Sequence, residues 1–85
     1  MDISRAEQRI LHLLAQGGRI ELIRDDSRKI ADIKLITRDG WLFHDLELET
    51  FRKLKRKRAI SSRKGQPYGV TRRGLDLVRS QLNNR

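Results

Sequence analysis

Apolar residues recur at every third position in the middle of the chain, with charged residues between them. Leu48, Phe51 and Leu54 fall on one face of a helix that turns by about 100° per residue. This spacing predicts a helix over residues 46–58, and Asp45 is suited to be its N-cap. The opposite face of the same helix carries four cationic side chains, those of Arg52, Lys53, Arg56 and Lys57.

Two short extended segments and a last helix follow this basic helix. Ala59–Ser62 and Gln66–Val70 flank the cationic turn formed by Arg63, Lys64 and Gly65, which predicts a hairpin, or wing, over residues 59–71. Thr71 is suited to cap a helix over residues 72–83. Leucines and a valine recur at helical spacing in that last segment, and we expect them to pack back on the first helix.

The first half of the chain predicts a helix followed by a β-hairpin. Ser4 and Glu7 stand in the spacing of a capping box, which begins a helix over residues 5–16 that ends at a pair of glycines. Alternating apolar and charged residues then predict strands at 19–24 and 29–37, joined by a turn at Asp25 and Asp26. Residues 41–43 form a third short strand or the first packed residues after the next turn.

A cationic helix followed by a cationic hairpin is the outline of a winged helix-turn-helix. The sequence therefore predicts an α+β fold, a winged helix-turn-helix-like single domain over residues 1–85 with an additional N-terminal β-hairpin. With 85 residues, the chain can form a modest core but no deep catalytic cleft.

The charge of the chain is concentrated in its second half. Residues 1–51 contain eight basic and ten acidic residues, a net charge of −2, whereas residues 52–85 contain twelve basic residues and only Asp76, a net charge of +11. No acidic residue lies within residues 52–58, so we expect the cations there to be unpaired. Such a distribution favours a polyanion or an acidic protein surface as the partner.

Composition also limits the compartment. The chain has no cysteine, and its N-terminus lacks an apolar signal core. No apolar run approaches the roughly 20 residues that a membrane span needs. We expect a soluble, cytoplasmic protein with no membrane partner.

No arrangement of residues predicts catalysis. His12 and His44 lie in different predicted elements without the spacing of metal ligands, and the adjacent Asp25 and Asp26 are better explained by their turn. We therefore predict that the protein is not an enzyme and has no catalytic residues, no metal site and no cofactor.

The basic residues do predict a binding surface. In winged-helix proteins the recognition helix enters the major groove of DNA and the wing follows the phosphates. The candidate residues come from the basic helix, the wing and the start of the last helix: Arg52, Lys53, Arg56, Lys57, Arg63, Lys64, Arg72 and Arg73. The helix face has no Asn or Gln suited to adenine, which favours contacts with phosphates over base reading. Aromatic residues are only 5% of the chain, and we expect them to be buried, which argues against a stacking platform for single strands.

The sequence also resembles, nearly from end to end, a known family. The stretches that carry the resemblance are Ser4–Arg9, Leu11–His12, Gly17–Ile20, Ile23–Asp25, Phe51–Lys55, Gly65–Tyr68, Val78–Arg79, Gln81–Leu82 and Asn84–Arg85. In order and at fixed spacing, they resemble the YjhX family of small bacterial toxins, also called TopAI. The segments least like the family are residues 28–41 and the pair Arg72–Arg73.

The resemblance implies a function that the residues alone do not. It implies the toxin of a toxin–antitoxin pair, with a cognate antitoxin as one partner and bacterial DNA topoisomerase I, a type IA enzyme, as the other, inhibited by protein–protein contact. The alternative from charge and pattern is a winged-helix DNA-binding protein or transcription regulator that binds duplex DNA with low sequence specificity. A cationic helix can serve either function, because it can dock on an acidic protein surface as well as on DNA.

Overall fold

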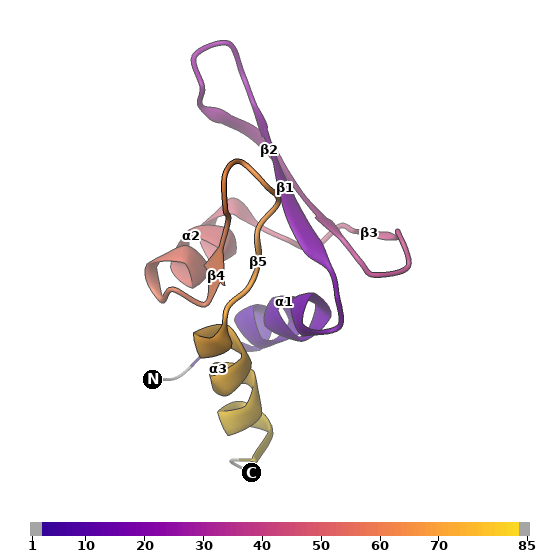
Figure 1. The fold of residues 1–85 in the computed structure, drawn as a ribbon, viewed down its shortest axis with the longest axis vertical. Coiled ribbons are helices and arrows are strands. Elements are labelled where there is room, and N and C mark those ends of the chain that lie inside the picture. The colour runs from indigo at the N-terminus through magenta and orange to yellow at the C-terminus, as the bar shows by residue number, and fades with distance from the viewer. Residues whose placement is uncertain (1–2, 84–85) are drawn as a thin grey trace.

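The computed structural model describes residues 3–83, and the side chains of residues 3–80. Three helices and two antiparallel sheets follow one another along the chain (Figure 1). The elements are α1 (Arg5–Ala15), β1 (Arg19–Arg24), β2 (Ile30–Ile36), β3 (Leu42–Phe43), α2 (Leu48–Arg56), β4 (Ile60–Ser61), β5 (Gly69–Val70) and α3 (Arg72–Asn83).

The capping box at the start of α1 is confirmed. The Ser4 hydroxyl accepts a hydrogen bond from the Glu7 backbone N–H at 3.1 Å, and the Glu7 carboxylate accepts one from the Ser4 N–H at 3.1 Å. Both bonds give an acceptor to a backbone N–H group that the start of a helix otherwise leaves without one. At the other end, α1 stops at Ala15, one residue before the predicted end, and Gly17 adopts a left-handed conformation with φ of 109°.

The first sheet consists of β1, β2 and β3 in chain order, all antiparallel. Opposite each other in the register stand Ile20 and Leu35, both fully buried. Towards the turn the two strands leave the core and project as a long arm (Figure 1). The observed β2 is one residue shorter at each end than the predicted strand, and β3 confirms a third short strand.

The basic helix is shorter than predicted. Its first residue is Leu48 and its N-cap is Glu47, which makes no side-chain capping bond, so the prediction of Asp45 as N-cap was wrong. The chain forms a turn at residues 44–45 and Leu46 packs against the core, which delays the start of the helix. The helix ends at Arg56 rather than at residue 58, because Arg58 takes the left-handed conformation with φ of 58°.

The hairpin β4–β5 and helix α3 complete the fold. The paired segments are shorter than predicted, with Ile60 opposite Val70 and Ser61 opposite Gly69. Thr71 caps α3 as predicted: its hydroxyl oxygen accepts a hydrogen bond from the Gly74 N–H at 3.0 Å, and its O–H donates to the Arg58 carbonyl at 2.7 Å.

Two further contacts fix the position of α3. A side chain at Gly74 would collide with the carbonyl of Ala59, so α3 approaches the base of the hairpin closely enough to require glycine. Helix α3 also packs on α1, as the sequence predicted (Figure 1).

One apolar cluster joins these elements. Its fully buried members include Ile10 and Leu11 of α1, Ile20 of β1, and Phe51 and Leu54 of α2. The helix α2 is therefore anchored by the same stripe that the sequence pattern predicted.

The hairpin β4–β5 is attached to both the first sheet and α2. Tyr68 forms an isolated bridge with Ile20, and its ring packs edge-on against Phe51 with ring centroids 5.0 Å apart. The predicted α+β class is thus confirmed. A three-stranded sheet separates α1 from α2 along the chain, so the element that precedes α2 is β3 rather than a helix.

Candidate binding surface

One exposed face of α2 is cationic, and we call it the helix patch: Arg52, Lys55 and Arg56. Residues three and four positions apart lie side by side on a helix, so these side chains form one group. Together with Leu48 and Glu49 they line a shallow hollow of about 830 Å³. Among the described residues, no acidic side chain lies within ion-pair distance of the three cations.

The helix patch is connected directly to the core. The Lys55 ammonium lies over the ring of Tyr68, 5.9 Å from its centroid, and Tyr68 packs on the buried Phe51. Lys55 was not among the predicted binding residues. The signal that could have identified it is its i+3 spacing from Arg52, which places it beside that residue as firmly as Arg56 at i+4.

Lys53 lies beside Glu49, which precedes it by one turn of α2. Its ammonium is 3.6 Å from the Glu49 carboxylate, which corrects the expectation that the cations of this segment have no acidic partner. Both side chains are largely exposed, so the pair is worth only about 0.3 to 0.5 kcal/mol. Lys53 therefore borders the helix patch with part of its charge compensated.

Lys57 does not share the exposed face, and this part of the prediction was wrong. It is the C-cap of α2, and its ammonium lies 2.7 Å from the carboxylate of Glu7 on α1. Glu7 is only 3% exposed. The pair is therefore a structural link between α1 and α2, and Lys57 has turned away from the side chains of the helix patch.

The environment of Glu7 changes its acidity. Burial raises the pKa of the Glu7 carboxyl, but the hydrogen bonds from Lys57 and from Ser4, with the charge of Lys57, lower it by more. The resulting pKa lies below the ordinary value of 4.5. Glu7 is thus held as a carboxylate at neutral pH by partners on both sides.

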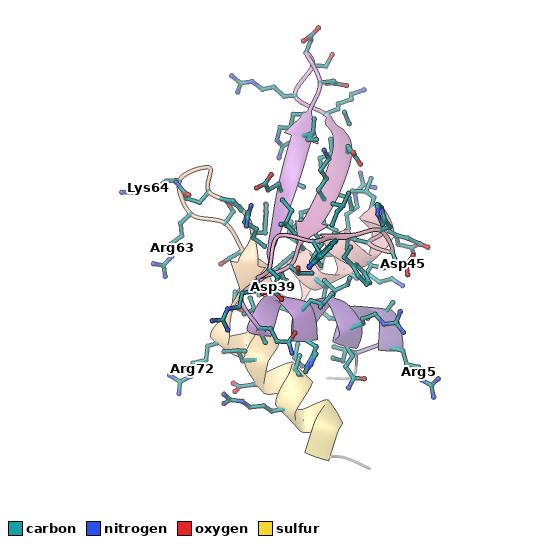
Figure 2. The ribbon with its side chains drawn as sticks, turned by 90° about the vertical axis from the view of Figure 1, so that its right-hand side faces the viewer. Arg5, Asp39, Asp45, Arg63, Lys64 and Arg72 are labelled. Carbon is teal, nitrogen blue, oxygen red and sulfur yellow. The ribbon has the colours of Figure 1, made fainter. Side chains whose placement is uncertain are left out.

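A second cationic group, which we call the wing patch, comprises Arg63, Lys64 and Arg72. Arg63 and Arg72 line one hollow of about 520 Å³ between the hairpin turn and the start of α3. Figure 2 shows all three side chains projecting from one side of the molecule, whereas Asp45, just before α2, lies on the opposite side. Arg73 is exposed in the first turn of α3 but does not line this hollow.

The eight predicted residues therefore do not form one continuous surface. The structure brings Arg52 and Arg56 together on α2, and Arg63, Lys64 and Arg72 together at the hairpin and α3. The remaining three lie at the margins or, for Lys57, in an internal ion pair.

The aromatic residues are not all buried, contrary to expectation. Trp41, in the turn before β3, is 74% exposed, and the next residue, Leu42, is 44% exposed. The turn is held by the Trp41 N–H, which donates to the Thr37 hydroxyl at 3.0 Å. Sequence gave no signal for this exposure, because short apolar runs of this kind also occur in buried strands.

Neither a metal centre nor a membrane segment is found in the part of the chain that the structure describes. Across residues 3–83, no three His, Cys, Asp or Glu side chains gather in a way that could hold a metal ion. Within the same residues, no helix has the length and apolar content needed to cross a membrane.

Fold and surface together define a small α+β protein with two exposed cationic patches. Among known proteins, a family model described as "Putative toxin of bacterial toxin-antitoxin pair" matches residues 1–85. The chain therefore belongs to this family, the YjhX toxins. The description implies an antitoxin as a partner.

Its relatives have the same length and come from several bacteria. The chain is 73% identical to a UPF0386 protein of Agrobacterium fabrum and 67% identical to one of Rhizobium etli, over the whole of both chains in each case. It is 64% identical to a UPF0386 protein of Hyphomonas neptunium over 99% of each chain. No solved structure matches the chain.

Proposed function

We propose that this protein is the toxin of its pair and that it inhibits bacterial DNA topoisomerase I by binding the enzyme through the helix patch. The resemblance of the sequence to the topoisomerase-inhibiting toxins supports the target. The observation that carries the choice of surface is the group formed by Arg52, Lys55 and Arg56, which is exposed and forms no ion pair with any described acidic side chain; Glu49, at the edge of the same hollow, pairs with Lys53.

Electrostatics explains why such a surface suits this target. Three like charges on adjacent turns repel each other in the free protein, and an acidic partner surface would relieve that repulsion. A topoisomerase could offer an acidic protein surface, or the protein could occupy DNA that the enzyme needs. Either mode would place the toxin in the cytoplasm with its target.

The hairpin can add to this interface as a wing. Because Lys55 lies over the ring of Tyr68, the helix patch is continuous with the base of the hairpin. The cations at the hairpin tip, Arg63 and Lys64, belong to the separate wing patch. We propose that α2 and β4–β5 serve as the helix and wing of a winged-helix-like scaffold. Lys53 and Arg73 would lie at the margins of the contact.

A second candidate function, binding of duplex DNA with low sequence specificity, is favoured by the wing patch. Arg63 and Arg72 share a hollow next to the first turn of α3, a combination suited to a phosphate group. If about six phosphates are contacted, the logarithm of the affinity should fall with the logarithm of salt concentration with a slope near −5.

The decisive experiment measures binding to purified bacterial topoisomerase I, with both proteins freed of nucleic acid, at physiological salt. The triple variant R52E/K55E/R56E should lose at least about 100-fold in affinity, equivalent to about 2.7 kcal/mol. It should also no longer inhibit relaxation of supercoiled DNA.

A matched control separates the helix patch from net charge. The variant R5E/R9E/R79E changes net charge equally at exposed positions on α1 and α3, and should lose less than about tenfold. Equal losses in both variants would refute the helix patch as the interface. Absence of binding by the unmodified protein, together with salt-dependent binding to duplex DNA, would favour the second function.

A further inference from the structure

The strand β1 has an outer edge that is only partly covered. On one side β1 pairs with β2, and on the other side Ile20 meets Tyr68. The Ile20 N–H donates to the Tyr68 carbonyl at 2.9 Å, and the Tyr68 N–H donates to the Ile20 carbonyl at 2.8 Å. Both backbone groups of Ile20 therefore point away from β2.

The backbone groups of Leu22, two residues after Ile20, point in the same direction. Backbone groups alternate along an antiparallel strand, so the N–H and C=O of Leu22 point to the same outer edge as those of Ile20. In a continued ladder Gln66 would stand opposite Leu22, but its N–H donates to the Arg63 carbonyl at 2.8 Å and its carbonyl accepts from the Ser62 hydroxyl, both within the hairpin turn. Within residues 3–83, no hydrogen bond joins the hairpin β4–β5 to Leu22, and the pairing ends after a single bridge.

A hollow occupies the space where the next pair would lie. Its volume is about 370 Å³, and its walls are the edge of β1 and the turn between β4 and β5, which run side by side in Figure 1. Leu22 and Tyr68 supply apolar contacts, Gln66 a polar one and Arg24 a positive charge. Glu21, the acidic residue of the wall, is already paired with Arg19 at 2.9 Å.

We propose that this edge of β1 binds an extended, acidic segment of a partner protein, which adds to the sheet as a further strand beside Leu22. The exposed backbone groups select an extended chain, since only such a chain presents donors and acceptors at matching intervals. Arg24, whose guanidinium donates to the Arg28 carbonyl at 2.9 Å and forms no ion pair with any described acidic side chain, selects acidic side chains. This site differs from the helix patch, and its test does not involve topoisomerase.

The probe is a library of short linear peptides displayed on phage and selected against the full chain at physiological salt. Enriched peptides should be acidic and should contain no proline at their centre. When an enriched peptide is synthesised and titrated, the Leu22 amide should shift in the NMR spectrum and its hydrogen exchange should slow. Selection of peptides that leave Leu22 unchanged and shift amides of α2 or β3, or selection of none, would overturn the proposal.

Backbone methylation of the peptide tests the strand geometry directly. N-methylation of the amide that faces Leu22 should lower the affinity by at least about tenfold, whereas N-methylation of the next amide, which points away, should change it less than about threefold. Equal effects at both positions would show that the peptide binds through charge alone and would contradict an added strand.

Two variants of the protein test the selection of acidic segments. Arg24→Glu should weaken the same peptide by about tenfold, while Lys29→Glu, an equal change of charge in the arm outside the hollow, should weaken it by less than about threefold. Equal weakening by the two variants would show that Arg24 has no particular role and would count against the proposal.

Discussion

Helices α1 and α2 pack in one core, but their first turns are stabilised differently. The start of α1 is stabilised locally by the Ser4–Glu7 capping box. The N-cap of α2, Glu47, forms no such bond, and α2 also carries several like charges in its 9 residues. What secures α2 is tertiary: Phe51 and Leu54 are buried, and Lys57 is paired with Glu7.

The lack of a side-chain cap makes α2 depend on its contacts with the rest of the domain. A helix that displays unpaired cations to a partner loses stability through their repulsion, and contacts with the rest of the domain must offset that loss. The cations of this segment therefore have different roles. Arg52, Lys55 and Arg56 face outward, Lys53 is weakly paired with Glu49 on the same helix, and Lys57, the C-cap, holds the helix in place.

Removing the ammonium of Lys57 should have the largest effect on stability. Lys57→Met leaves the carboxylate of Glu7 buried without its partner, and we expect a loss of about 2 to 3 kcal/mol in the free energy of unfolding, measured by urea denaturation. Lys53→Met, a matched change four residues earlier on the exposed side of α2, should lower it by no more than about 0.5 kcal/mol, the worth of its exposed pair with Glu49. Similar losses in the two variants would show that the cations do not differ in role as proposed.

Acid should weaken the same link. Because its folded pKa is lowered, the stabilisation from Glu7 is fully present above the ordinary pKa of 4.5 and is lost as pH falls from there through the folded pKa. The unfolding free energy of the unmodified protein should therefore decline more steeply with acid than that of Glu7→Gln. Parallel pH profiles for the two proteins would exclude Glu7 as a source of the acid sensitivity.

The features that the sequence predicted well are local ones. The capping box joins residues three apart, Thr71 bonds to Gly74, and strand β1 has the predicted bounds, because each depends on a short stretch of chain. The apolar stripe of α2 was also predicted, since helical periodicity sets it.

The features that the sequence did not predict depend on distant partners. Lys57 and Glu7 are 50 residues apart, and no rule of spacing brings them together. The late start of α2 follows from the packing of Leu46 against the core. The exposure of Trp41 depends equally on which elements cover β3, which only the folded chain decides.

Loss of the capping box should have a moderate effect. Ser4→Ala removes the acceptor for the Glu7 N–H and should lower the unfolding free energy by about 1 kcal/mol. Ser80→Ala, an exposed serine within α3, serves as the control and should be neutral or slightly stabilising. Thermal unfolding of the two variants measures the difference. Equal changes in unfolding free energy would mean that the capping bond of Ser4 does not stabilise the domain.

The smallest effect should be a gain, at the uncapped start of α2. Glu47 already has the extended conformation of an N-cap, with φ of −94° and ψ of 149°, but its side chain makes no capping bond. Aspartate is one methylene shorter and is among the preferred N-caps, so Glu47→Asp should raise the unfolding free energy by about 0.5 to 1 kcal/mol at unchanged net charge. Glu49→Asp makes the same chemical change inside the first turn and should instead cost a few tenths of a kcal/mol, because aspartate is a weaker helix former and the pair with Lys53 is lengthened.

If Glu47→Asp stabilises the domain and leaves the affinity of the helix patch for its partner unchanged, α2 is held weakly at its start for lack of a cap rather than for binding. A stabilised variant that binds its partner less well would show instead that the loose start of α2 is part of the interface.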